Sequence, residues 1–367
     1  MCIRDRDYPG RWGTYFKAPM NTVLATSETA ASNKIMLRTT AEELIVEDGK
    51  VTGVKATQYD GTPVTAHATK GVVIATGGYA ANLQMVVDTN VYWSSDYLST
   101  STKTTNRSSL KGDGITMAQA AGADVTGMGY TQMMPISWID DGNLAFGGGN
   151  YAIYLNPTTG KRFVDETSER DVLSLAEFRN GIEHNGTKGV FIEIANAGSK
   201  IPGPYLYGNE DVEWRQYVRT VDQLAELFNS LGLETDADTV RATIENYDKA
   251  IMAGEQPEGV KKTNPNALIG SADKDENGNY LPETYKLDGV ELRVRFMAPS
   301  THHTMGGIKV DTERHALDAD GNVIPGLYAA GEVTGGIHGG NRLGGNAIVE
   351  IFVSGRTAAE AIQADNK

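Results

Sequence analysis

The residues best suited to chemistry gather in one stretch near the C-terminal end, Pro299 to Ile351. It holds His302, His303 and Arg342, together with four glycine pairs that let the backbone approach a ligand closely. An apolar-periodic run follows the last glycine pair and predicts a helix, whose first backbone N–H groups lack partners within the helix. Those groups belong to Gly345, Asn346 and Ala347. The stretch therefore predicts a binding site for an anion.

Two buried strands that end in glycine are expected to position this stretch. Gly71 to Gly78 is a continuous apolar run that closes on two glycines, and Gly326 to Glu332 is a second run that closes on glycine and an acid. Such runs are typical of strands covered on both faces of a parallel sheet. Because α/β folds bind nucleotides at the carboxyl ends of these strands, Gly77 and Gly78 are expected to lie near a nucleotide.

The elements before the first of these strands are expected to form a small separate sheet. Helical spacing predicts a helix over Asn21 to Asn33, and Lys34 to Thr39 is interpreted as a strand. Leu44 to Ala68 alternates strand-like runs with turn residues such as Asp60 and Gly61, which predicts a β-meander.

The sequence changes character between about Thr131 and Met297, which predicts an inserted domain. Within it we expect a hairpin loop over 156–161, amphipathic helices over 221–231 and 239–253, and a polar loop over 257–285. The predicted fold is an α/β nucleotide-binding domain, formed by residues 7–130 and 298–367, that is interrupted by an α+β cap over residues 131–297.

Composition narrows the class of partner. The 367 residues carry a formal charge of −14, and 40% of them are hydrophobic. This charge argues against nucleic acid or an anionic membrane as a partner. No apolar run approaches the length of a bilayer, so we predict no membrane segment in this chain.

The first six residues are expected to be foreign to the protein. Met1 to Arg6 is the translation of a transposon-end sequence used in preparing sequencing libraries, so we interpret it as a sequencing scar and expect the natural protein to begin upstream. The single cysteine, Cys2, lies within this segment. Without Cys2 there is no disulfide, cysteine-ligated zinc or thiol nucleophile, and we predict no metal site.

Four further motifs complete the pattern: HHTMGG (302–307), HGGNRLGGNAI (338–348), GDGITMAQAAGA (112–123) and GKRFVDETSERD (160–171). Together with the two strand-then-glycine motifs, they closely resemble the fumarate reductase/succinate dehydrogenase flavoprotein family. The nearest branch is the soluble bacterial one, which includes flavocytochrome c fumarate reductase and urocanate reductase. The resemblance covers nearly all of the chain from about Pro19 onward, and it implies an FAD-dependent oxidoreductase acting on CH–CH groups.

The resemblance also implies roles for individual residues. Hydride from flavin N5 would reduce the C=C bond of an α,β-unsaturated carboxylate, while Arg170 would protonate the α-carbon. The catalytic and carboxylate-binding positions would be His302, Arg342 and Gly345. Together with Gly77 and Gly78, the positions that match FAD contacts are Ala41, Asp113, His303, Glu332, Ala347 and Ile348, the last two through backbone N–H groups.

The chain departs from the fumarate-reducing pattern at two places. Met134 stands where the family has a histidine, and the Thr-Glu-x-x-Arg segment that binds the second carboxylate has no match in 143–149. Because an unpaired buried charge is costly, we predict that fumarate is not the substrate. A monocarboxylate with an apolar or aromatic tail suits Met134 and Phe146. The proton relay to Arg170 stays open, with Glu166, Glu169 and Asp171 as candidates.

Other interpretations remain open. The family's Gly-x-Gly-x-x-Gly turn is absent, and an electron donor carrying haem or FMN would also be encoded upstream. The enzyme could instead run in reverse, as a succinate-, amino-acid- or ketosteroid-type dehydrogenase or oxidase, or the chain could be a non-catalytic fragment. Lack of native cysteine favours an exported bacterial protein over a cytoplasmic one.

Individual residues also have a simpler interpretation. Asp113 could be a plain helix N-cap. Glu332 could be a solvated loop acid, and Arg170 a surface residue within a charged run. Outside the motifs, His67, His184 and His315 are expected to be exposed because their neighbours are polar.

Overall fold

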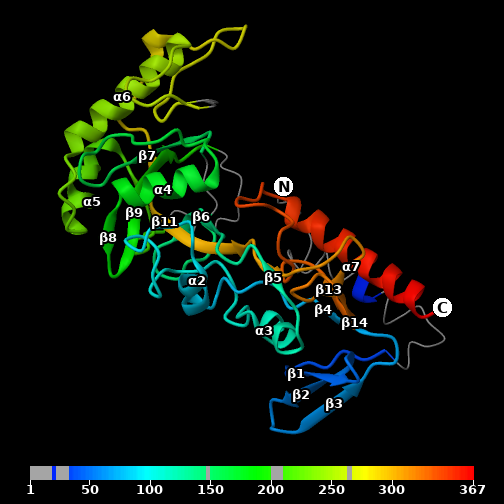
Figure 1. The fold of residues 1–367 in the computed structure, drawn as a ribbon. Helices are drawn as coiled ribbons and strands as arrows, with labels where there is room; N and C mark the ends of the chain where they lie inside the picture. Colours follow the sequence, from blue (N-terminus) through cyan, green and yellow to red (C-terminus); the bar gives the residue numbers. More distant parts are fainter. Residues whose placement is uncertain (1–18, 22–32, 146–148, 200–209, 263–266) are drawn as a thin grey trace.

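A computed structural model of the protein describes residues 19–21, 33–145, 149–199, 210–262 and 267–367. The predicted helix over Asn21 to Asn33 falls almost wholly outside the described residues, as do Met1 to Arg6 and Phe146. Figure 1 shows two bodies connected by the long strand β11 (Leu292–Thr304), with a small sheet at the end of the molecule opposite helix α6 (Ala237–Ala253).

The small sheet is the predicted β-meander. Its strands are β1 (Thr39–Glu47), β2 (Lys50–Gln58) and β3 (Pro63–His67), antiparallel in that order. Asp48 and Gly49 make the first turn with φ values of 50° and 77°, a backbone that matches the twist of a hairpin. The strand predicted over Lys34 to Thr39 is wrong. The chain reaches β1 through a turn in which Arg38 has a φ of 53°, a value incompatible with a strand.

The first body contains the two predicted strands, but the first of them is not buried on both faces, because Val73 is 41% exposed. Its sheet has the order β13-β14-β4, with β4 (Val72–Ile74), β13 (His315–Leu317) and β14 (Val323–Ala329). Strand β14 runs parallel to β4, with Tyr328 opposite Val73, so distant segments of the chain meet in one sheet. This pairing confirms the predicted parallel strands. The remaining elements are α2 (Leu83–Thr89), α3 (Asp113–Ala120), β5 (Val125–Thr126), β12 (Gly307–Ile308) and α7 (Asn346–Asp365).

In the described part of the chain, the second body is a six-stranded sheet with three α-helices. Strand β11 pairs with β6, β9 and β10, while β7 and β8 pair with β9. These elements are β6 (Thr131–Trp138), β7 (Ala152–Leu155), α4 (Arg170–Asn180), β8 (Ile182–His184), β9 (Thr187–Asn196), β10 (Gln216–Arg219), α5 (Leu224–Ser230) and α6. The two predicted amphipathic helices are confirmed: a 3-10 turn, Val221–Gln223, precedes α5, and Asp236 caps α6 by accepting from two backbone N–H groups.

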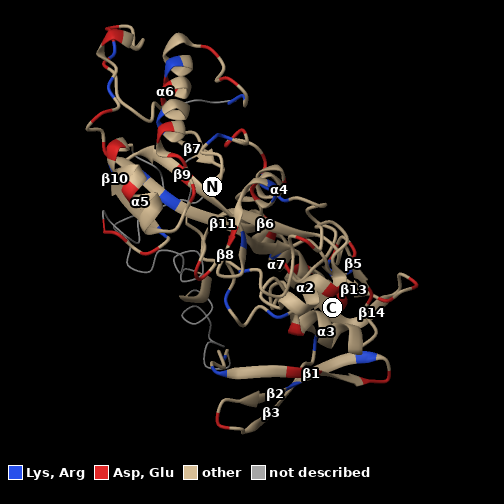
Figure 2. Cartoon of the chain, turned by 90° about the vertical axis from the view of Figure 1, so that its left-hand side faces the viewer, with Lys and Arg blue, Asp and Glu red and all other residues tan. Residues whose placement is uncertain are grey.

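Each body has its own hydrophobic core, and α4 lies where the two meet. Ile244 and Phe228 belong to the core of the second body, while Ile115 and Leu327 belong to that of the first. Phe178 of α4 is buried in the first core although α4 also packs on strands β6 and β9. Figure 2 shows acidic and basic positions interspersed along the coloured part of the chain. The domain boundaries at 130 and 297 remain a prediction.

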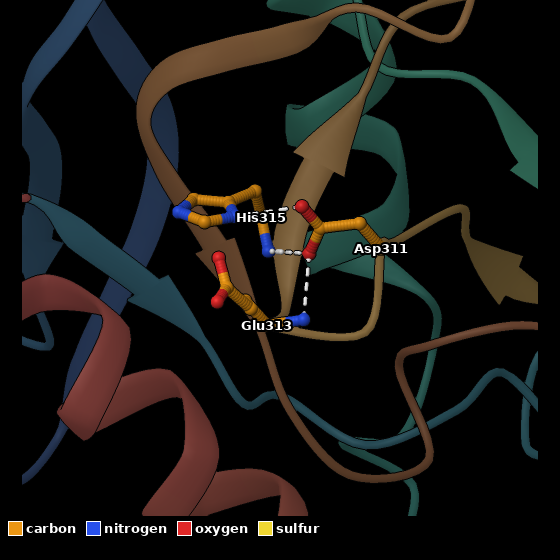
Figure 3. A group of neighbouring side chains, drawn as sticks. All are labelled: Asp311, Glu313 and His315. Carbon is orange, nitrogen blue, oxygen red and sulfur yellow. Dashed lines mark hydrogen bonds and ion pairs between the residues drawn. The ribbon is translucent and has the colours of Figure 1, made fainter.

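Helix α7 is tethered to the first sheet near its C-terminal end. His315 Nδ1 lies 2.8 Å from Asp311 Oδ2, and its Nε2 lies 2.9 Å from Asp365 Oδ2 in the last turn of α7. Figure 3 shows the turn in which Asp311 also accepts from the backbone N–H groups of Glu313 and His315. His315 is 8% exposed, so the prediction that it is exposed is wrong: its ring is enclosed by carboxylates and Tyr328.

Candidate active site

The C-terminal end of β11 carries His302 and His303 toward the first body. In its pairing with β6, Met133 lies opposite Thr301 and Gln132 lies opposite His303, so His302 is the extra residue of a β-bulge. A bulge bends a strand and re-aims a side chain. This irregularity gives the two adjacent histidines different surroundings.

A neighbouring loop holds His302. Its Nδ1 lies 2.6 Å from Thr105 Oγ1, and Asn106 Nδ2 donates to its backbone carbonyl at 2.8 Å. Burial, together with the positive charges of Arg170 and Arg342, lowers the pKa of His302 to about 3. The ring is therefore neutral near pH 7. Because Thr105 engages Nδ1, Nε2 is the nitrogen left for a ligand.

Gln132 joins the two arginines. Arg170 donates from Nη1 to Gln132 Oε1 at 3.1 Å, and Gln132 Nε2 donates to the backbone carbonyl of Arg342 at 2.6 Å. Arg342 is 6% exposed. Arginine keeps its charge in proteins, so two guanidinium groups beside a neutral histidine form a positive site. The structure thus brings Arg170, His302 and Arg342 together, while their roles in a reaction stay predictions.

Buried His303 and half-buried Glu332 form a second group of titratable side chains. His303 Nε2 lies 3.6 Å from Glu332 Oε2, and Glu332 Oε1 accepts from the backbone N–H of Thr304 at 3.0 Å. Burial is the main cause that lowers the pKa of His303 and raises the pKa of Glu332 to about 7. Glu332 is therefore tied to β11, and the alternative of a solvated loop acid does not hold.

Gly78 lies against this second group, and Gly77 beside it turns the chain. A Cβ atom at Gly78 would collide with Thr304 Oγ1 and with Glu332 Oε1, so only glycine allows this approach. Gly77 has a φ of 77°, which a side chain rarely adopts. The glycines after β4 therefore bring its carboxyl end against the end of β11.

The start of α7 differs from the sequence-based expectation in its hydrogen bonds. Gly345 is the N-cap with a φ of 92°. The backbone N–H of Asn346 donates to Leu343 O at 3.3 Å, and that of Ile348 donates to Gly345 O at 3.1 Å. The expectation that Asn346 presents a free N–H group is wrong, because the chain tightens into a turn before the helix. The backbone N–H of Ile348 is likewise engaged, because it donates to Gly345 O.

The other predicted positions lie in three different elements. Ala41 is half-buried in β1, and Met134 is 3% exposed in β6. Asp113 is exposed and is the first residue of α3, where its charge suits the helix dipole. Gly112 is the N-cap of α3, so the alternative that Asp113 is a plain N-cap does not hold.

The three candidates for the proton relay have different environments. Glu166 is fully engaged: Arg162 binds both of its carboxylate oxygens at 2.8 Å, and Lys262 lies 3.4 Å away. Glu169 is the exposed N-cap of α4. Asp171 is linked to the loop that carries Arg342, because its carboxylate accepts a hydrogen bond from Asn341 at 2.8 Å. Glu166 is thus held by cations of the second body.

The main residues that sequence reasoning missed are Gln132 and Thr105. The sequence gives one local signal for Gln132, which is a polar residue followed by Met133 and Met134 in an apolar strand. Nothing near Thr105 in the sequence marks its contact with His302. Both residues become visible only when β6, β11 and the loop before α3 are brought together.

Comparison with known proteins identifies the type of fold that carries this site. A family model described as "FAD binding domain" matches residues 7–348. The chain belongs to this FAD binding domain family. FAD is thereby confirmed as the cofactor, and the expected flavoprotein fold is confirmed as well.

Individual relatives of this FAD binding domain carry reductase names. The chain is 39% identical over 337 residues to the NADH:acrylate oxidoreductase of Vibrio harveyi, which covers 90% of this chain and 30% of that protein. It is 31% identical over 332 residues to the urocanate reductase of Eggerthella lenta, covering 89% and 50%. A flavocytochrome c3 fumarate reductase in its open conformation matches with a TM-score of 0.65 and 27% identity, covering 89% of this chain and 52% of that one. The chain thus spans at most about half the length of these relatives.

The described residues fit a flavin at this end of β11. His303 Nδ1 and His338 Nε2 are buried, and neither has a hydrogen-bond partner within the described part of the chain. On α7, which begins in the same region, Ile348 is 37% exposed and Phe352 is 45% exposed. Polar ring edges without partners and uncovered apolar side chains both match a large planar group with polar edges and apolar faces. His303, Glu332 and Ala347 would contact its polar edges, and Ile348 would contact its apolar face.

Proposed function

We propose that the chain is the FAD-containing part of an oxidoreductase that reduces the C=C bond of an α,β-unsaturated monocarboxylate. The observation that carries this proposal is the cluster of Arg170, Arg342 and neutral His302 beside the start of α7. Two fixed cations and a polar ring nitrogen match one carboxylate and one proton donor. When bound, FAD supplies the hydride.

Arg342 and His302 would hold the substrate. A guanidinium can bind a carboxylate with two parallel hydrogen bonds, and His302 Nε2 donates a third in the tautomer in which Nδ1 accepts from the Thr105 hydroxyl. As the C=C bond is reduced, negative charge develops toward the carboxylate, and these donors stabilise it. The low exposure of Arg342 strengthens this effect because water screens the charge less.

Arg170 would deliver the proton to the α-carbon. A free arginine is a poor acid, so this role needs a dry site and neighbouring positive charge that makes the proton easier to lose. The charge of Arg342, which acts on His302 as that of Arg170 does, and the hydrogen bond to Gln132, which orients one edge of the Arg170 guanidinium, support the assignment. The deprotonated arginine must then regain a proton from solvent or from a relay group.

The substrate is proposed to carry one carboxylate. Met134 is buried in β6, where the resemblance to the fumarate-reducing pattern implies a histidine that helps to bind a second carboxylate. An apolar thioether leaves such a charge without a partner, and burying an unpaired charge is costly. Acrylate-like or cinnamate-like acids therefore fit better than fumarate. The similarity to a relative named NADH:acrylate oxidoreductase supports the same choice.

A test compares substrates in the whole protein that contains this chain, loaded with FAD. Reduced viologen is the electron source under anaerobic conditions, and acrylate, cinnamate, urocanate and fumarate are compared by kcat/KM. We expect a monocarboxylate to exceed fumarate by at least about 100-fold, because a buried unpaired carboxylate costs several kcal/mol. Equal or faster reduction of fumarate contradicts the proposal. Oxidation of saturated acids with no reduction would favour the reverse reaction, and a protein that takes up no FAD would favour a non-catalytic fragment.

The electron donor and the cellular compartment are also proposals. Among the described helices, none is long and apolar enough to cross a bilayer. We propose that electrons arrive from a haem- or FMN-carrying module or protein, and that the bacterial protein works outside the cytoplasm. Cell fractionation tests the proposed compartment: we expect the protein in the extracytoplasmic fraction, and its presence in the cytoplasmic fraction would contradict this.

A further inference from the structure

Asp171 and Asn341 form a contact that spans the two bodies. Asp171 lies in the first turn of α4, and Asn341 lies in the glycine-rich loop before α7. Asn341 Nδ2 donates to Asp171 Oδ1 at 2.8 Å. The hydroxyl of Tyr92, which belongs to the segment after α2, donates to the other oxygen of Asp171 at 3.3 Å. The start of α4 is thus held by two groups from outside the second body.

The two residues are direct chain neighbours of the two arginines. Asp171 follows Arg170, and Asn341 precedes Arg342. Gln132 closes the ring, because its Nε2 donates to Asn341 Oδ1 at 2.6 Å and its Oε1 accepts from Arg170 at 3.1 Å. A hydrogen-bonded ring therefore runs from Arg170 through Gln132 and Asn341 to Asp171 and back along the chain.

The chemistry at the ends of this ring sets the orientation of its two amides. Arginine only donates hydrogen bonds, and an ionised aspartate only accepts them. Facing Asp171, Asn341 must present its NH₂ group, so its oxygen faces Gln132. Gln132 must then present its own NH₂ group to Asn341, which leaves its oxygen for Arg170. Only this orientation of the two amides gives every hydrogen bond in the ring one donor and one acceptor.

We propose that Asp171 and Asn341 are positioning residues, a latch that sets the distance between Arg170 and Arg342 and orients the Arg170 guanidinium for proton transfer. This inference rests on the proposed function, since it assigns the latch to the same site. Neither latch residue needs to touch the substrate. Each acts through its neighbour in the chain, so a loosened latch misplaces the proton donor relative to the bound carboxylate.

A swap of the two side chains tests the latch. Asp171→Asn removes the acceptor that orients the ring, and Asn341→Asp places two carboxylates against each other. In the double variant Asp171→Asn/Asn341→Asp the two groups exchange roles: the new amide donates to the new carboxylate, which still accepts from Gln132. We expect each single variant to lose ~10- to 100-fold in kcat with KM changed less than ~3-fold, and the double variant to recover most of the loss. Glu183→Gln, which removes an exposed acid in β8, is the matched control and should leave kcat unchanged.

The measurements use the whole FAD-loaded protein, with flavin absorbance to show that all variants hold the cofactor. Thermal unfolding of the same proteins gives a readout that does not depend on the reaction: both single variants should lower the midpoint and the double variant should restore it. If the wild type reduces no unsaturated acid, the proposed function is wrong. The unfolding midpoints of the single and double variants still test the latch in that case. Additive effects of the two substitutions on both kcat and the unfolding midpoint would overturn the latch.

Discussion

The guanidinium of Arg170 lies directly against Gly344. A Cβ atom at position 344 would stand 3.2 Å from Arg170 Nη2, tighter than an ordinary van der Waals contact. The proposed proton donor and the glycine-rich loop before α7 therefore fit together by shape as well as by charge. The absence of a side chain at this position sets how closely Arg170 can approach the proposed substrate site.

Gly344→Ala should displace Arg170 without preventing folding. Gly344 is not among the glycines with positive φ, so alanine fits its backbone, and the far end of a flexible side chain can yield by a few tenths of an ångström. We expect kcat to fall by ~10-fold or more because proton transfer depends on donor position. Gly355→Ala in α7, where the added methyl group meets nothing within 4 Å, is the control. Unchanged kcat in Gly344→Ala would separate Arg170 from the reaction.

Arg170→Ala should abolish reduction while leaving cofactor binding intact. Positioned acids contribute ~100- to 10,000-fold to rate, so kcat should fall by at least that much. Arg170 contacts Gln132 and Gly344 and has no predicted contact with FAD, so the absorbance of bound flavin should stay unchanged. A variant that holds its flavin and still turns over at the wild-type rate would show that another group donates the proton.

Glu332→Gln should change how stability depends on pH. Burial raises the pKa of Glu332 to about 7, above the usual value of 4.5, so the protonated form is favoured in the folded state. Its contribution to stability is complete below pH 4.5 and is lost as the pH rises through 7. We expect glutamine to flatten this decline and to stabilise the protein at pH 8 by roughly 1–3 kcal/mol. Denaturant unfolding between pH 4.5 and 8 measures this decline, with the exposed Glu283→Gln as the control.

His315→Gln should destabilise the protein mainly at low pH. Burial alone would lower the pKa of His315, but hydrogen bonds and charge from Asp365 and Asp311 outweigh it and raise the pKa above 6.5. The bridge is therefore fully formed below pH 6.5 and weakens as the pH rises through the raised value. We expect a loss of about 1–3 kcal/mol at pH 6 and less at pH 9.

The same pH series in His67→Gln, an exposed histidine of β3, is the control for His315→Gln. An equal loss of stability at both pH values in His315→Gln would mean that the bridge acts through packing and not through charge.

Local patterns in the sequence by themselves determine much of this protein. The Asp-Gly turns predict the β-meander, the apolar runs that end at Gly78 and Gly331 predict the parallel strands, and the periodic run after Gly345 predicts α7. Turn chemistry and burial periodicity act over a few neighbouring residues, so the sequence records them directly. That Arg170, His302 and Arg342 share one site was instead implied by the resemblance of their motifs to a known flavoprotein family.

Only the tertiary structure decided how those side chains are held. Gln132 connects Arg170 to the loop of Asn341 and Arg342. Asp365 binds His315, a histidine that was predicted to be exposed because its neighbours in the sequence are polar. Each of these contacts joins segments far apart in the chain. Their formation depends on strand register, on the bulge at His302 and on the packing of α4, none of which leaves a periodic signal within its own segment.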